Sequence, residues 1–242
     1  MLNMHPISIM TFGDDSHCDV VTKMLTFLDV THLCRVSRVN CFMKRASSAE
    51  QLWEFHWQED MKDKLHVLRL DIPTKFALSH ARQQARRTWL SKVELTSLAW
   101  DFRFRKSAGN EWLDVDPYAN GLEAAHVKFH ADGSAQFSGI PGLDEKDIKW
   151  TWARSGAGKK GPQGSFLKLT VDGSALPAYI VTRHSNWGFV LQNCWGVFTS
   201  FPMPAAGTDP SLEDDSLLDL SLSQQSEVLQ YRKPGGLFRW LF

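Results

Sequence analysis

The sequence lacks any excess of charge and is poor in cysteine. Lysine and arginine together number 27, as do aspartate and glutamate. A neutral chain has no global field that would draw it to nucleic acid or to an anionic membrane. Its four cysteines have neither the paired spacing of a zinc site nor the density of a disulfide framework. We therefore expect a protein of a reducing compartment that binds neither nucleic acid nor membranes.

Long apolar runs are missing as well. No stretch approaches the roughly eighteen apolar residues that a membrane span needs. The segment 1–11 has neither the basic start nor the apolar centre of a signal peptide. The expected location is therefore the cytoplasm, the nucleus or both.

Motifs that carry catalysis or bind cofactors are also absent. The nine histidines form no H-E-x-x-H pattern, and no Gly-x-Ser-x-Gly elbow occurs. The glycine-rich segment 155–161 lacks the spacing of a phosphate-binding loop and precedes an expected strand. His126 and His130 would stand about 13 Å apart on an extended strand, too far for one metal ion. We expect no catalytic residue, no metal and no cofactor.

Tryptophan, in contrast, is abundant, with ten residues along the chain. Indole rings need burial and their N–H groups need partners, so the count predicts a packed core and allows an aromatic binding surface. The tryptophans of the expected strand region include Trp112, Trp150, Trp152, Trp187 and Trp195.

Three short helices are predicted between residues 19 and 46. In the first, the apolar residues recur at steps of three and four, which places them on one face. Asp29 or Thr31 can cap the second helix and Asn40 the third. Helices of two or three turns are marginal alone in water, so these must pack on one another or on a partner.

The order of landmarks in this region resembles the F-box pattern. The matching residues are Phe27, Leu28, Asp29, Leu33, Val36, Ser37, Val39, Phe42, Leu52 and Trp53. The resemblance covers residues 17–60, roughly one sixth of the chain. Family members usually open with Leu-Pro, where this chain has Ser16 to Asp19, so the motif is a divergent one.

The resemblance implies that these helices bind the Skp1-type adaptor of a cullin-RING (SCF) ubiquitin ligase. The strand-rich half would then capture a target protein, and catalysis would belong to other subunits. The candidate adaptor-binding residues are Val20, Met24, Leu25, Leu28, Leu33, Val36 and Phe42. Three alternatives stay open: a plain helical core, a scaffold component outside any ligase, and a small-ligand-binding barrel with a helical cap.

A longer helix is predicted to begin at Thr74, just after Pro73, and to run to about Val93. Alanines recur along it at steps of four. Arg82, Arg86, Arg87 and Lys92 give it a basic face. This helix belongs to the expected linker, residues 61–96.

From Leu98 the apolar period changes to two, which predicts strands. The expected strands are 100–104, 126–130, 135–137, 148–152, 166–171, 179–182, 187–190 and 195–201. Asp132-Gly133 and Asp172-Gly173 are typical of hairpin turns. The fold class is therefore α+β, with the helices followed by an antiparallel domain over 97–203. A barrel is the first choice, and a β-sandwich is the second.

A turn at the end of this domain is the candidate site for a target or ligand. It consists of Arg183, His184, Asn186 and Trp187, which would combine polar groups with an aromatic ring. Residues 1–16 form an N-terminal extension. The tail, 204–242, is acidic with a basic, aromatic end, and its Ser211 and Ser216 suit an acidophilic kinase.

Overall fold

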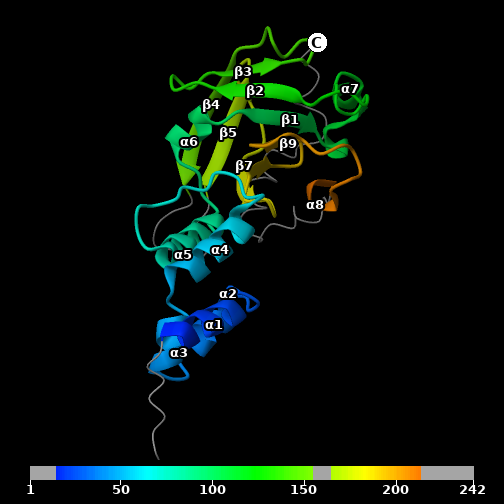
Figure 1. The fold of residues 1–242 in the computed structure, drawn as a ribbon. Coiled ribbons are helices and arrows are strands. Elements are labelled where there is room, and N and C mark those ends of the chain that lie inside the picture. The colour runs from blue at the N-terminus through cyan, green and yellow to red at the C-terminus, as the bar shows by residue number, and fades with distance from the viewer. Residues whose placement is uncertain (1–14, 155–164, 214–242) are drawn as a thin grey trace, which may run out of the picture. The chain divides into compact units, whose positions relative to one another are not determined.

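A computed structural model of the chain describes residues 15–154 and 165–213 (Figure 1). The chain divides between Gln84 and Ala85 into two compact units. We call them the helical unit and the barrel unit and describe each by itself. Together they confirm the expected α+β class.

The described residues of the helical unit form five helices. They are α1 (Asp15–Leu25), α2 (Val30–Val36), α3 (Cys41–Ala46), α4 (Glu50–Met61) and α5 (Thr74–Ala85). The predicted caps are present: the Asp29 carboxylate accepts a hydrogen bond from His32 N at 2.8 Å, and the Asn40 amide oxygen accepts one from Met43 N at 2.8 Å. Each cap satisfies a backbone donor that the first turn leaves without a partner.

A small apolar core holds these short helices together. Leu33, Leu52 and Trp53 are almost fully buried. The Trp53 indole N–H donates to the carbonyl of Ser47 at 2.7 Å, so the trailing Leu-Trp landmark packs beneath the end of α3. Helices α4 and α5 are joined by Glu50, whose carboxylate accepts the backbone N–H of Thr74 at 2.8 Å.

The prediction of one helix from Thr74 to about Val93 is wrong in its second half. Helix α5 ends at Ala85, and a separate helix, α6 (Lys92–Ser97), follows. The break has a local cause: Ser91 and Glu94 form a capping box, in which each side chain bonds the other residue's backbone N–H. This motif begins a new helix. The basic residues that were expected on one helix face therefore lie on different elements.

The barrel unit is built from antiparallel strands. They are β1 (Trp100–Phe104), β2 (Ala125–Phe129), β3 (Ala135–Ser138), β4 (Ile148–Arg154), β5 (Ser165–Val171), β6 (Ser174–Ala175), β7 (Tyr179–Arg183), β8 (Phe189–Gln192) and β9 (Gly196–Thr199). All eight expected strands overlap an observed one, and β6 is the addition. Asp172 and Gly173 both adopt positive φ, as the predicted two-residue hairpin turn between β5 and β6 requires.

Pairing between neighbouring strands makes the sheet a nearly closed barrel, which confirms the first choice over a sandwich. The strand order is β3-β2-β1-β9-β8-β7-β5-β4. The first strand in the chain, β1, therefore pairs with the last, β9. The remaining seam, between β3 and β4, contains one isolated bridge, Ser134 with Lys149, and a hydrogen bond from Trp150 N to the Gly133 carbonyl at 2.7 Å.

Aromatic side chains fill the interior of this barrel. Phe102 lies at its centre, with ring centroids 5.2 Å from Phe137, 5.7 Å from Trp195 and 4.6 Å from Phe198. A Cβ atom at Gly196 would lie 2.4 Å from the Phe102 ring, so only glycine fits there. A dense interior leaves space for a ligand only where the barrel ends.

The two ends of the barrel are closed differently. Helix α6 precedes β1 and closes one end: Leu90 and Leu95 belong to the interior cluster, and the Trp100 indole donates to the Leu95 carbonyl at 2.9 Å. The other end carries the 3₁₀ turn η1 (Lys106–Ala108) and α7 (Asn110–Asp114), which follow β1 (Figure 1).

Arg103 on the outer face of β1 is buried, although alternation predicts that it is exposed. Arg103 donates to the carbonyl of Leu212 at 2.6 Å and stacks on the ring of Tyr118. Leu212 belongs to α8 (Pro210–Glu213), so the start of the expected tail packs on the barrel.

Candidate functional site

The structure separates the seven candidate adaptor-binding residues by burial. Leu25 and Leu33 are buried, whereas Leu28, Val36 and Phe42 are half-buried. Val20 and Met24 are 58% and 64% exposed. The first group holds the helical unit together, and the last two are free to contact a partner.

Phe27 is an exposed apolar residue that the candidate set missed. It lies in the turn after α1, where its backbone N–H bonds the Met24 carbonyl, and its side chain is 89% exposed. Val20 and Met24 share one side of α1, and Phe27 follows Met24 by three residues in the turn after the helix. We call these three residues the α1 stripe. The F-box landmarks contain Phe27, but sequence periodicity gives no sign that it points outward.

Hydrogen bonds fix the backbone beside the α1 stripe. Asp29 accepts from the backbone N–H of His32, and its second oxygen lies 2.7 Å from the His32 ring. These contacts, the backbone one first, lower the pKa of Asp29. The turn that presents Phe27 is therefore tied to the start of α2.

The candidate turn at the end of β7 does bring its residues together. Arg183 places its guanidinium 3.4 Å from the centre of the Phe189 ring and donates to the Trp187 carbonyl. Burial lowers the pKa of Arg183 to about 10, and the charge of Arg87 adds to this effect.

The polar groups of this turn bond within the barrel unit. His184 lies 2.6 Å from the carboxylate of Asp209, and the Asn186 side chain accepts from Gly188 N at 2.8 Å. Trp187 adopts a positive φ of 66°, which the turn requires. These contacts fix the conformation of the turn. They also engage the polar side chains that were predicted to bind a target or ligand.

The phosphorylation expectation for the tail divides in two. Ser211 lies in α8 and donates from its hydroxyl to the Asp209 carboxylate at 2.6 Å. Ser216 lies outside the described residues, and so does the glycine-rich segment 155–161.

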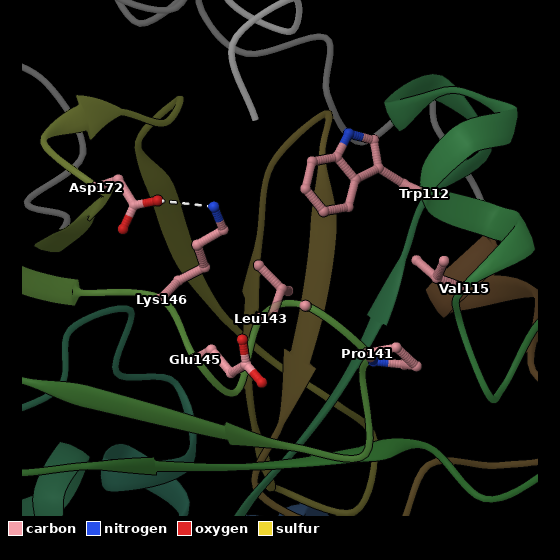
Figure 2. A pocket seen from close by; sticks show the side chains of 8 residues that line it. Trp112, Val115, Pro141, Leu143, Glu145, Lys146 and Asp172 are labelled. Carbon is pink, nitrogen blue, oxygen red and sulfur yellow. Dashed lines mark ion pairs between the residues drawn. The ribbon is translucent and has the colours of Figure 1, made fainter. Parts of the chain in front are cut away.

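The barrel end opposite α6 contains a cavity of about 390 Å³ (Figure 2). We call it the barrel-mouth cavity. It is lined by Trp112, Val115, Pro141, Gly142, Leu143, Glu145, Lys146 and Asp172. The four residues of the candidate turn are absent from this lining.

One wall of the barrel-mouth cavity is aromatic and rigid. Trp112 on α7 is 8% exposed, and its ring centroid lies 5.0 Å from that of Phe104 and 5.2 Å from that of Trp195. These interior rings support the indole from behind. The sequence singled out Trp112 as aromatic, but only the fold places it at an opening.

The opposite wall is a polar clasp between two loops. Lys146 Nζ lies 2.9 Å from the Asp172 carboxylate, and Asp172 also accepts the backbone N–H of Asp147 at 3.1 Å. Both contacts, that of Lys146 first, lower the pKa of Asp172. The clasp joins the loop after β3 to the turn after β5 and so fixes the width of the cavity.

Metal binding and membrane spanning find no support in the described part of the chain. Within residues 15–154 and 165–213, no three histidine, cysteine, aspartate or glutamate side chains gather closely enough to hold a metal ion. No helix of those ranges has the length and apolar character needed to cross a bilayer.

Comparison with known proteins gives no further guide to function. The chain matches no family model, and no curated protein or solved structure shows significant similarity to it.

Proposed function

We propose that this protein is an F-box-type substrate receptor of a cullin-RING ubiquitin ligase. Its helical unit would bind a Skp1-type adaptor, and its barrel unit would capture a target protein. The observation that carries the proposal is the α1 stripe, three exposed apolar side chains in a helical unit whose core contains the F-box landmarks Leu33, Leu52 and Trp53.

Burial of the α1 stripe would supply a useful free energy of association. Each valine, methionine or phenylalanine side chain contributes about 1.5–3 kcal/mol when it is fully removed from water. Part of this gain offsets the loss of rotational and translational freedom on binding. Apolar helix faces of this kind bind in apolar grooves of partner proteins, which is the chemistry we propose for the adaptor.

The division into two units suits a receptor. One unit offers an apolar helix face and the other a separate concave site, so each can bind its own partner. The proposal assigns the covalent chemistry to other subunits. Because aromatic rings fill the barrel interior, a small-ligand-binding barrel is less favoured than a receptor that uses the barrel's end.

Co-purification with the adaptor and a cullin tests the proposal. We expect Phe27→Asp in the full chain to abolish association and to leave the protein folded, because the side chain is exposed. Leu122→Asp is the matched control, since it places the same charge at an exposed apolar position of the barrel unit. Leu33→Asp is unsuitable, because a buried charge would unfold the helices.

Two results would contradict the proposal. One is a folded wild-type protein that fails to bind the adaptor, which would favour a scaffold component outside any ligase. The other is equal adaptor binding by wild type and Phe27→Asp, which would remove the α1 stripe from the interface.

A further inference from the structure

We propose that the barrel-mouth cavity binds an arginine side chain of the target protein. Trp112 would stack on the guanidinium, and Glu145 would form its ion pair. The choice of a protein as the source of the arginine rests on the proposed function, whereas the chemistry of recognition rests on the cavity alone.

The cavity has the size and the place of a side-chain pocket. It lies at the end of the barrel that α6 does not close, where the interior meets the surface. Its volume of about 390 Å³ is near the lower limit for ligand pockets, which run from roughly 300 to 1,000 Å³. It therefore suits one long side chain better than a large lipid or cofactor.

The aromatic wall selects a planar or cationic group. Figure 2 shows the Trp112 indole on one side of the cavity and the Lys146–Asp172 pair on the other, with Leu143 between them. The side chain of Trp112 is nine-tenths buried and packs against the interior rings of Phe104 and Trp195. Tryptophan is the aromatic residue that attracts cations most strongly.

The charges of the lining decide between a cation and an anion. Lys146 is the lining residue with a positive charge, and Asp172 already neutralises it at 2.9 Å. Glu145 is exposed and has no ion-pair partner in the described part of the chain. The lining therefore has a net charge of −1, centred on Glu145, which attracts a cation and repels an anion.

Arginine fits this pair of features better than lysine does. Its guanidinium is planar, so it can stack on an indole and present two parallel N–H donors to one carboxylate. The barrel unit already uses the first contact elsewhere: Arg87 lies 4.3 Å above the ring of Trp89. An ammonium group lacks the flat face and the bidentate geometry.

Titration of the purified full-length protein with a short peptide tests the inference without the adaptor. The probe is acetyl-Gly-Arg-Gly-amide, and its control contains citrulline, which has the same shape and no charge. We expect saturable binding that shifts the NMR signal of the Trp112 indole N–H, assigned through Trp112→Phe. The citrulline peptide should bind at least about tenfold more weakly, because a charge-assisted hydrogen bond is lost.

Two variants of one loop separate contact from general charge. Glu145→Gln should weaken the arginine peptide by about tenfold, whereas Asp144→Asn should change its affinity by less than about twofold. Each variant removes one negative charge, but Asp144 does not line the cavity. Thermal unfolding checks that both variants are folded.

Equal binding of the arginine and citrulline peptides would overturn the inference, as would no saturable binding or equal losses in the two variants. Acetyl-arginine-amide serves as a further arm: it has the same side chain, so it should also bind, and a failure to bind would overturn the assignment to the arginine side chain. Glu145→Gln should co-purify with the adaptor as wild type does. Failure of the cavity and failure of the adaptor interface are thus read out separately.

Discussion

His56 lies inside the helical unit in an environment that disfavours its charged form. It is 6% exposed, and its ring centroid lies 5.4 Å from that of Phe55 and 6.4 Å from that of Trp53. The buried Nε2 atom has no hydrogen-bond partner among the described residues. Burial therefore lowers the pKa of His56 below the ordinary value of 6.5.

This pKa predicts an acid-sensitive helical unit. Between the lowered pKa and 6.5 the unfolded chain binds more protons than the folded one, so the free energy of unfolding falls as the pH drops through this window. We expect a lower urea midpoint at pH 5.5 than at pH 7.5, followed by far-UV circular dichroism. In His56→Leu the difference should shrink, and an unchanged difference would assign the effect to other groups.

Burial also sets the limit of sequence prediction at this scale. Phe27 and Leu33 are both landmarks of the F-box resemblance, yet one is 89% exposed and the other 0%. A periodic pattern identifies an apolar face, but the neighbours that cover part of it come from α3 and α4. The candidate set could therefore name the right helices and still include Leu25 and Leu33, which serve the core.

At the scale of elements, the start of α6 depends on a few polar contacts. Ser91 accepts from Glu94 N at 3.2 Å, and Glu94 accepts from Ser91 N at 2.9 Å. Arg87 adds a salt bridge to the same carboxylate. Six residues separate the two helices, and this network fixes where the second begins.

The capping box yields a stability prediction for α6. Ser91→Ala removes the side chain that accepts the Glu94 N–H, and we expect it to lower the free energy of unfolding by about 1 kcal/mol. Ser97→Ala is the control on the same helix, with an expected change within about 0.5 kcal/mol. Urea denaturation of both variants measures the difference, and equal effects would show that the cap does not stabilise the helix.

Helix starts were more predictable than the helix end at Ala85. Asp29 and Asn40 begin their helices because short polar side chains bond the first turn. The step of four that joins the alanines of α5 continues in sequence to Trp89, so periodicity alone extends the helix. The S-x-x-E pattern at Ser91 marks the new start, and the prediction of one long helix did not use this signal.

At the scale of the whole molecule, the barrel has one weak side. Strands β4 and β5 pair over seven residues, and β1 pairs with β9 over four. The β3–β4 seam has one bridge, Ser134 with Lys149. Few backbone hydrogen bonds hold this seam, so local opening should begin there.

Hydrogen exchange measures this difference between the two sides. We expect the amides of β3 to exchange faster than those of β8 and β9, which have paired neighbours on both sides. Peptide-level mass spectrometry at fixed pH resolves these segments. Slower exchange in β3 than in β8 would contradict a weak seam.

The strand region was largely predictable, whereas its closure and its cavity were not. Asp-Gly turns and alternating residues identify hairpins because both signals are local. The pairing of β1 with β9 joins Asp101 to Thr199, residues far apart in sequence, and no local signal specifies it. The barrel-mouth cavity combines a helix, a loop and a turn, so its lining is defined only once the strands have closed.

The same closing pair has a consequence for how this protein can diversify. Because β1 and β9 are neighbours, the first and last strands of the barrel lie side by side, and the segment that follows β9 packs back beside β1 through Leu212. A domain whose entry and exit are adjacent can be exchanged as a cassette, since a replacement needs to match only two nearby joints. New specificities can therefore be gained by swapping the barrel and leaving the helices that precede it untouched.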